Sequence, residues 1–358
     1  MHGIHISDVR SFKQCRRKWS FSSPLRMNLE SIIPYAPFFS GRAIHHCLEM
    51  YYEHGTPLDE SLAEYLEQEE KSMAEAGDLW PQEKSMFAEQ IYLLGGMLKH
   101  YNQWISRDKT RWADDQLEVI AMETEFQVPL TNPLTGEDSE DLFLEGRFDG
   151  IVQRKDDGSL WLWEVKTTRS IKELSDSLRL DEQAGAYLLA AQKLYGKPFA
   201  GVLYTMLRKK APTRPDKLQN GMLSKKKSLD TSSYAYAEAI RSHHEESSDE
   251  YLLEHYGTML RHYSEKNTSF FLRVPVYRTQ QELSLLEADL WHVATDMTNL
   301  DVPLYPSPNW LSCKFCFFRA PCELMNSGNS PKLTLEASYR ERQPWQMFKS
   351  TEERNVPA

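Results

Sequence analysis

The stretch that most limits the fold of this chain is Leu142–Thr168, with the sequence LFLEGRFDGIVQRKDDGSLWLWEVKTT. Its two apolar runs are bounded by turn residues and predict two β-strands. Asp157 and Gly158, between the runs, are typical of a two-residue hairpin turn. We therefore expect an antiparallel β-hairpin here.

Three charged side chains interrupt these apolar strands. Side chains alternate between the two faces of a strand, so Glu164 and Lys166 point the same way. A two-residue turn places Asp149 opposite Lys166 and Ile151 opposite Glu164, which brings Asp149, Glu164 and Lys166 onto one face. A three-residue loop would reverse that parity.

Two carboxylates and a lysine on one sheet face indicate a chemical role. Carboxylate oxygens are the ligands that hard cations such as Mg²⁺ prefer. A lysine beside them can stabilise developing negative charge or orient a water molecule. The alternative is a solvated strand with an ordinary Glu–Lys pair, which contributes little to stability.

The chain as a whole has 358 residues and a net charge of −10, with no biased tract or repeat. It is long enough for one large domain or two modest ones. No apolar run reaches membrane-spanning length and no signal peptide is evident, so we expect a cytoplasmic protein. The acidic balance excludes a protein that coats DNA by charge alone, but allows a local basic groove.

The segment 38–52 predicts a helix that starts at Ser40 or Gly41 and carries His45. On spacing alone, a single helical histidine is more often a packed core residue than a ligand. Neutral imidazole is nevertheless a reasonable ligand for Mn²⁺ and a tolerable one for Mg²⁺.

Periodicity predicts most other elements. Residues 58–107 are helical with a break at Pro81, and the strand 117–130 carries Glu123 and Glu125, for which we favour a surface role over metal binding. The later elements are a strand over 202–207, a helix over 234–263, a strand over 270–277 and a helix over 279–297.

A helix is also expected over 180–195, ended by Gly196. Gln183 and Tyr187 lie four residues apart on it and therefore share a face. They are either ordinary residues of an amphipathic helix or part of a site beside the hairpin.

Basic residues gather in two places. Arg16 and Arg17 lie on a short N-terminal helix that Ser7 or Asp8 would cap. The second place is 208–227, a Pro- and Gly-containing stretch that begins with Arg208, Lys209 and Lys210. Both are either solvated surface or contacts for a phosphate backbone.

Three cysteines cluster near the C-terminus as C-x₂-C-x₅-C: Cys313, Cys316 and Cys322. In a cytoplasmic protein such a cluster indicates a metal rather than disulfides. The fourth ligand must then be Cys15 or Cys47, and Cys15 is the better candidate because Cys47 lies on the His45 helix as a probable core thiol. Ligand type alone allows structural zinc or a [4Fe–4S] cluster.

Together these motifs resemble a known family. Asp149 followed by Glu164-Val165-Lys166 is similar to the core of PD-(D/E)XK nucleases, although Phe148 stands where the motif name has proline. The G-x-x-x-H-x-x-L-E string ending at Glu49 and the Q-x-x-x-Y of the later helix resemble the RecB-like branch. One N-terminal cysteine with a C-terminal triplet resembles the iron–sulfur staple of that branch, including the AddB subunit and CRISPR-adaptation exonucleases.

The resemblance implies an α/β restriction-endonuclease-like core, a central mixed sheet flanked by helices, with a helical insertion and a C-terminal iron–sulfur clamp. We expect a single nuclease domain over 1–325, with the insertion at about 55–110, the catalytic core at about 115–210 and 268–298, and the clamp formed by Cys15 and 310–325. A polar tail would follow over 326–358.

The resemblance also implies a function. His45, Asp149, Glu164 and the Val165 carbonyl would bind Mg²⁺ or Mn²⁺, and Lys166, with Gln183 and Tyr187 beside it, would assist cleavage of DNA to 5′-phosphate products. It favours an exonuclease on single-stranded or free-ended DNA in bacterial or phage recombination, repair or CRISPR adaptation, where partner proteins are possible. The alternatives are a non-catalytic DNA-end-binding adaptor and a zinc-stabilised scaffold. Polarity and oligomeric state are not predicted.

Overall fold

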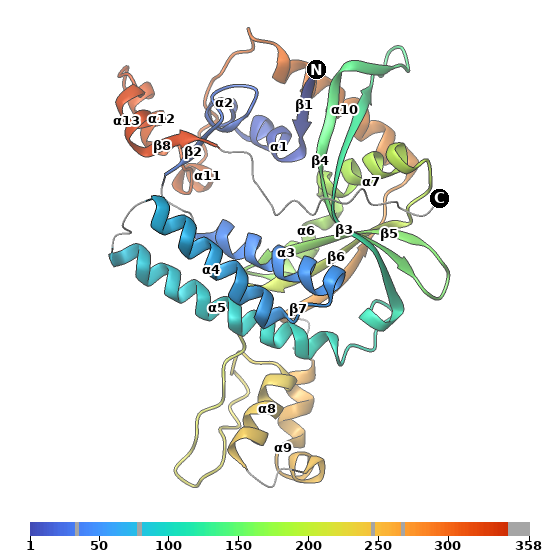
Figure 1. The fold of residues 1–358 in the computed structure, drawn as a ribbon, viewed down its shortest axis with the longest axis vertical. Helices are drawn as coiled ribbons and strands as arrows, with labels where there is room; N and C mark the ends of the chain where they lie inside the picture. The colour runs from blue at the N-terminus through green and yellow to red at the C-terminus, as the bar shows by residue number, and fades with distance from the viewer. Residues whose placement is uncertain (33–35, 77–80, 245–247, 266–268, 343–358) are drawn as a thin grey trace.

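A six-stranded mixed sheet forms the centre of the molecule, in the order β1-β4-β5-β6-β7, with β3 paired along the other edge of β4 (Figure 1). The computed structural model describes residues 1–32, 36–76, 81–244, 248–265 and 269–342. Pairing is parallel for β1–β4 and β5–β6 and antiparallel elsewhere in this sheet. The strands are β1 (His2–His5), β3 (Leu117–Thr131), β4 (Asp138–Arg154), β5 (Leu160–Thr168), β6 (Gly201–Arg208) and β7 (Phe271–Val276).

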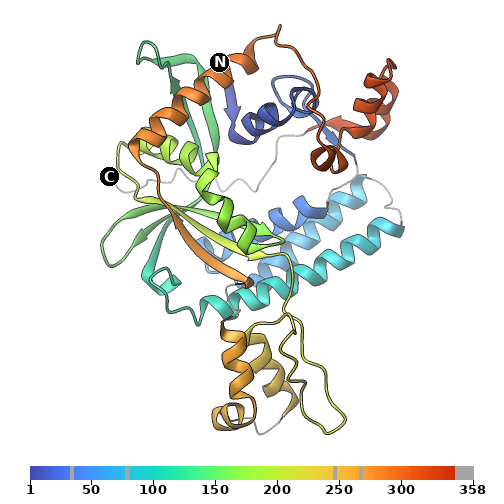
Figure 2. The same ribbon diagram turned by 180° about the vertical axis from the view of Figure 1, so that it is seen from behind.

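Helices cover both faces of the sheet, as expected (Figures 1 and 2). One core lies between the sheet and α1 (Ile6–Gln14), α7 (Glu182–Tyr195) and α10 (Gln280–Thr298). A second core joins the sheet to α3 (Ala36–His54), α4 (Leu58–Ala76) and α5 (Pro81–Ile105). The short elements α6 (Ile171–Ser177), η1 (Asp114–Gln116) and η2 (Leu178–Leu180) complete this body.

The central hairpin is present, but its loop is longer than predicted. β4 ends at Arg154 and β5 begins at Leu160, with Ile151 opposite Leu162 rather than Glu164. The Asp157 side chain accepts hydrogen bonds from the backbone N–H and hydroxyl of Ser159, which fixes the wider loop. The register differs from the predicted one by two residues, so the predicted parity is kept.

The expected helix boundaries follow local signals. α5 begins at Pro81, a residue whose missing N–H is tolerated in a first turn. α7 ends at Gly196, which has a left-handed φ of 61°. Thr279 and Glu282 form a capping box at the start of α10.

Three predicted helices differ in extent. The N-terminal helix divides at Cys15, whose extended backbone separates α1 from α2 (Arg16–Ser22), and His5 rather than Ser7 or Asp8 precedes α1. α3 begins at Ala36, before Ser40. The helix predicted over 234–263 is two helices, α8 (Ser233–His243) and α9 (Asp249–Ser264).

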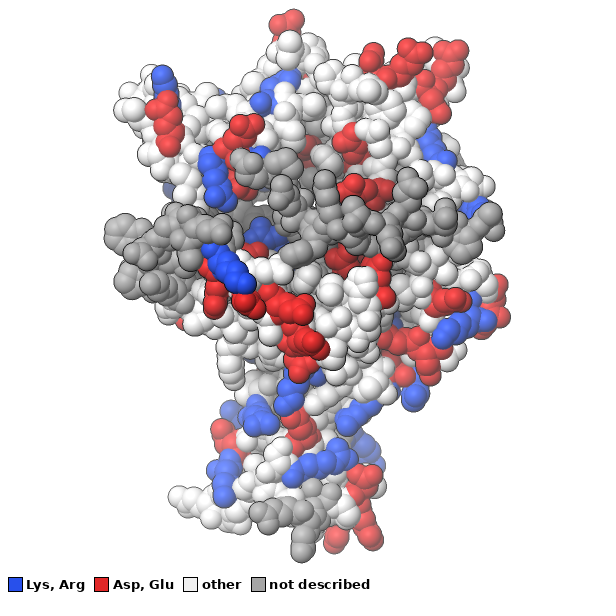
Figure 3. Space-filling view, viewed as in Figure 1, with Lys and Arg blue, Asp and Glu red and all other residues white. Residues whose placement is uncertain are grey.

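α8 and α9 have a small core of their own and extend from the body together with the residues before them (Figure 1). Lys217 and Leu223 form an isolated bridge in the preceding stretch. Figure 3 shows basic side chains gathered over this projecting part, among acidic ones.

The C-terminal segment contains α11 (Trp310–Lys314), α12 (Arg319–Asn326) and α13 (Lys332–Ser338). The strand β8 (Tyr339–Glu341) pairs with β2 (Leu29–Ser31), so the start of the predicted polar tail is structured. Residues 343–358 of that tail lie outside the described residues. Among the helices of the described segments, none is long and apolar enough to cross a membrane.

Candidate active site

Three potential metal ligands meet beside the central hairpin. His45 extends from α3, Glu123 from β3 and Asp149 from β4. The Nδ1 atom of His45 lies 3.4 Å from Asp149 Oδ1 and 3.5 Å from Glu123 Oε1. One ligand atom from each residue lies within 4.8 Å of the other two, close enough for a single cation to contact all three.

The surface role predicted for Glu123 is wrong. Only 4% of its side chain is exposed, and its second oxygen lies 2.5 Å from Arg147 Nε. The backbone of Glu123 has a φ of 45°, a conformation that is rare for a residue with a side chain. Such outliers persist where the surrounding structure enforces them, often at functional sites. Glu125, the alternative on the same strand, is exposed.

Asp149 lies just beyond the last described backbone pair between β4 and β5. The described pairs of this ladder end at Gly150 and Trp163. Beyond them, Asp149 Oδ2 accepts a hydrogen bond of 2.7 Å from the backbone N–H of Val165. The bond fixes the carboxylate, and its other oxygen is the one that faces His45.

Glu164 and Lys166 form an ion pair on the neighbouring strand β5, in which Glu164 is buried and Lys166 is partly exposed. The Gln183 side chain, from α7, donates to Glu164 Oε1 at 2.8 Å and accepts from Lys166 Nζ at 3.1 Å. One amide thus orients both charged groups. Glu164 itself lies outside the group formed by His45, Glu123 and Asp149.

The start of α7 holds that amide in place. Asp181 caps the helix by accepting the Gln183 N–H, and its carboxylate also accepts the Tyr204 hydroxyl at 2.9 Å and pairs with Arg10 of α1. Tyr187, one turn later, packs edge-on against Phe126 and Phe148. Gln183 therefore contacts the Glu164–Lys166 pair directly, and Tyr187 follows it one turn later on α7.

The pKa values show how strongly these groups interact. Burial alone would lower the pKa of His45, but the Asp149 and Glu123 carboxylates raise it to about 10. Burial alone would raise the pKa of Asp149, but the charge and hydrogen bond of His45 lower it. Burial, reinforced by the charge of Asp149, raises the pKa of Glu164 to about 7.

These residues fit a divalent metal ion. Two fixed carboxylates face a small space and are balanced there by the imidazole and by Arg147. Oxygen ligands with one imidazole suit Mg²⁺ or Mn²⁺ rather than a soft metal. A cation placed among them would balance the charge of the two carboxylates.

The arrangement agrees with a comparison against protein families. A model of the PD-(D/E)XK nuclease superfamily matches residues 6–323. The chain belongs to this superfamily. No curated protein matches the chain significantly. Members of the superfamily are nucleases that typically use Mg²⁺ or Mn²⁺, which supports an enzyme that acts on DNA.

The four cysteines predicted to bind a cluster come from the residue between α1 and α2 and from the segment of α11 and α12. Burial raises the pKa of Cys316, although the Phe318 N–H and the charge of Lys18 oppose this. The backbone N–H of Ser307 donates to Cys15 Sγ at 3.5 Å, so these two segments meet here. Cys322 lies 3.6 Å from Arg17 Nη1. Cys47 instead lies on α3 and is buried in the core between α3 and its neighbours, as predicted.

The basic residues predicted to contact DNA mostly have partners in the protein. Arg16 pairs with Asp296, and Arg17 donates to the Asn326 side chain. Arg208 forms a two-point pair with Asp230, which Lys210 also contacts, and Lys209 is half-buried. Their roles in DNA binding stay predictions.

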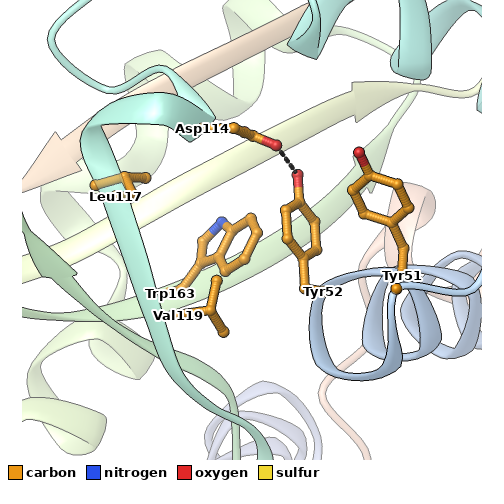
Figure 4. Close-up of a pocket in the computed structure, with 7 residues that line it drawn as sticks. Tyr51, Tyr52, Asp114, Leu117, Val119 and Trp163 are labelled. Carbon is orange, nitrogen blue, oxygen red and sulfur yellow. Dashed lines mark hydrogen bonds between the residues drawn. The ribbon is translucent and has the colours of Figure 1, made fainter.

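A separate hollow of about 520 Å³ lies beside Trp163 (Figure 4). Because side chains alternate along a strand, Trp163 lies on the face of β5 opposite to Glu164. Tyr52 and Trp163 form its wall, and the Tyr52 hydroxyl donates to Asp114 at 2.8 Å. The other Asp114 oxygen lies 2.6 Å from the buried Arg273. Sequence patterns gave no sign of this Arg273 contact because its partners are distant in the chain.

Proposed function

We propose that the protein is a metal-dependent deoxyribonuclease, and specifically an exonuclease on single-stranded or free-ended DNA in recombination or repair. The observation that carries the proposal is the convergence of His45, Glu123 and Asp149 beside the Glu164–Lys166 pair. A structural ion-pair network would not require two carboxylates and an imidazole to face one small space.

In the proposed phosphodiester hydrolysis, one set of residues binds the metal and another acts on the attacking water or the transition state. His45, Glu123 and Asp149 would hold Mg²⁺ or Mn²⁺, with Glu164 and the Val165 carbonyl as further candidate ligands. The bound ion supplies Lewis-acid stabilisation of charge on the phosphate and lowers the pKa of water. Lys166, held by Gln183, orients the attacking water or stabilises the negative charge that develops in the transition state.

We further propose that Cys15, Cys313, Cys316 and Cys322 hold a [4Fe–4S] cluster. Backbone N–H groups donate to Cys15 Sγ from Lys18 and Ser307 at 3.5 Å, and to Cys313 Sγ from Asn309 at 3.4 Å. Such donors stabilise thiolate sulfur. The role would be structural, because the ligands join the two chain ends.

Zinc is the alternative to the cluster, because four thiolate ligands suit either group. Iron and sulfide analysis with visible absorption separates an iron–sulfur cluster from a colourless zinc site.

The deciding experiment measures degradation of end-labelled DNA by the full-length protein with and without Mg²⁺ or Mn²⁺. Single-stranded, duplex and circular substrates are compared, beside Lys166→Ala. Metal-dependent loss of linear DNA that this substitution abolishes would support the exonuclease, and the position of the label gives polarity. Cleavage of circles would indicate an endonuclease, and binding without cleavage would indicate an adaptor.

A further inference from the structure

The segment around α11 exposes large aromatic side chains. Trp310 is 81% exposed and Phe315 is 60% exposed, whereas Phe318 is buried. Leu311, between Trp310 and Phe315 in the sequence, is also 51% exposed, and exposed large apolar side chains that gather in one segment indicate an interaction site.

The charges around these rings are positive. Lys314 stands four residues after Trp310, one turn later on the same face of α11, and its ammonium lies 5.4 Å from the centre of the Phe315 ring. Lys18 approaches from α2 and donates to the Gln14 side chain at 3.0 Å. Within the described residues, neither lysine lies within ion-pair distance of a carboxylate.

The nearby carboxylates are already neutralised. Asp296 lies 3.1 Å from Arg16, and Glu323 lies 2.7 Å from Arg319. The local surface therefore presents aromatic rings with uncompensated ammonium groups, on a chain whose net charge is −10. A polyanion with flat apolar groups fits both features, and an acidic or purely apolar protein surface fits only one of them.

The helix α1 connects this surface to the active site. Arg10 on α1 donates to Gln183 Oε1 at 3.5 Å, and Gln14, one turn later, donates to Ser312 of α11 at 3.2 Å. One helical turn advances about 5.4 Å. A strand lying along α1 would thus pass from the rings to the catalytic pair within a few nucleotides.

We propose that Trp310 and Phe315, with Lys314 and Lys18, form a stacking platform for unpaired DNA that leads into the active site. Proteins bind single strands by stacking bases on aromatic side chains while cations follow the backbone. Bases in a duplex are already stacked and paired, so the platform selects single-stranded DNA. The inference rests on the proposed function and specifies its substrate.

The test measures the affinity of the full-length protein for fluorescein-labelled oligo-dT, without divalent metal, by fluorescence anisotropy. Loss of one stacked base costs about 1–3 kcal/mol, so Trp310→Ala should raise the Kd about 5- to 150-fold. Trp310→Phe should restore most of the affinity. Tyr92→Ala is the matched control, because Tyr92 is 83% exposed on α5, and should leave the Kd unchanged.

Three further measurements identify the interaction. An abasic strand should bind the wild type weakly and should bind Trp310→Ala equally, because no bases remain to stack. Lys314→Ala should lower the slope of log Kd against log salt concentration by about 1, because one phosphate contact is lost. Duplex DNA of equal length should bind wild type and Trp310→Ala alike.

Several outcomes would overturn the platform. One is an unchanged Kd of Trp310→Ala for oligo-dT, and another is an equal loss in Tyr92→Ala. Light scattering that shows self-association lost in Trp310→Ala, with DNA affinity kept, would assign the surface to a second copy instead. A wild type that stacks single strands but never cleaves them would refute the nuclease proposal alone.

Discussion

Glu123 and Glu125 lie on the same strand and differ mainly in where their carboxylates lie. Glu123 faces His45 and Arg147, and Glu125 faces solvent. Glu123→Gln should lower metal affinity and DNA cleavage by at least about 10- to 100-fold. Loss of a residue that hydrogen-bonds to a metal ligand typically has this effect, and loss of the ligand itself should have at least as large an effect. Calorimetric Mn²⁺ binding and cleavage rates check this. Glu125→Gln is the control, and equal effects of the two changes would remove Glu123 from the site.

Arg273 shows how a single buried charge stabilises the sheet. Its guanidinium contacts Asp114, the Thr205 hydroxyl and the Trp112 carbonyl, with 2% of its side chain exposed. Arg273→Met should lower the free energy of unfolding by about 3–5 kcal/mol, because Asp114 and the polar groups lose their partner. Denaturant unfolding measures the loss. Arg241→Met, which removes an exposed pair with Asp249, should cost less than about 1 kcal/mol. Similar midpoints for both variants would contradict the argument.

At the scale of elements, α7 acts as a support for the catalytic strand. Gln183 orients Glu164 and Lys166 on β5 without being a candidate metal ligand itself. Gln183→Ala should therefore reduce kcat about 10- to 100-fold with little change in KM for DNA, since orientation rather than substrate contact is lost. Gln192→Ala, about 13 Å further along the same helix, should change neither constant. A rise in KM alone would assign Gln183 to DNA binding.

The same elements show what the sequence could predict. Alternation and capping signals identified β3, the β4–β5 hairpin, α7, β6 and α10, because those signals act between neighbouring residues. They missed β1, which pairs with the distant β4, and the β2–β8 pair, because such pairing depends on partners far along the chain. Glu123 was misjudged for the same reason, since its burial depends on His45 from α3. The face shared by Asp149, Glu164 and Lys166 survived the register error because the shift was even.

At the scale of the whole molecule, elements from both helical layers meet at one site. α1 and α7 approach it from one core and α3 from the other (Figures 1 and 2). Hydrogen bonds from Gln14 to Ser312 and from the Ser307 N–H to Cys15 Sγ hold the segment after α1 against the segment around α11, so a group bound to the cysteines would fix α1 against the rest of the chain. Metal–thiolate bonds formed only in the folded protein contribute directly to folding free energy.

Loss of the metal group from the cysteines should consequently destabilise the chain ends more than the central sheet. Cys15→Ser should lose iron and visible absorption, lower the unfolding temperature and expose the segments next to α1 and α11 to limited proteolysis. Cys47→Ser is the matched control, because burial raises the pKa of Cys47 to about 12 and makes it an inert core thiol. It should keep its iron and its protease resistance. If Cys15→Ser retained the full metal content and the same cleavage pattern as the wild type, the chain ends would be joined by packing alone. Contacts such as the stacked Phe21 and Phe318 would then supply the clamp without a metal.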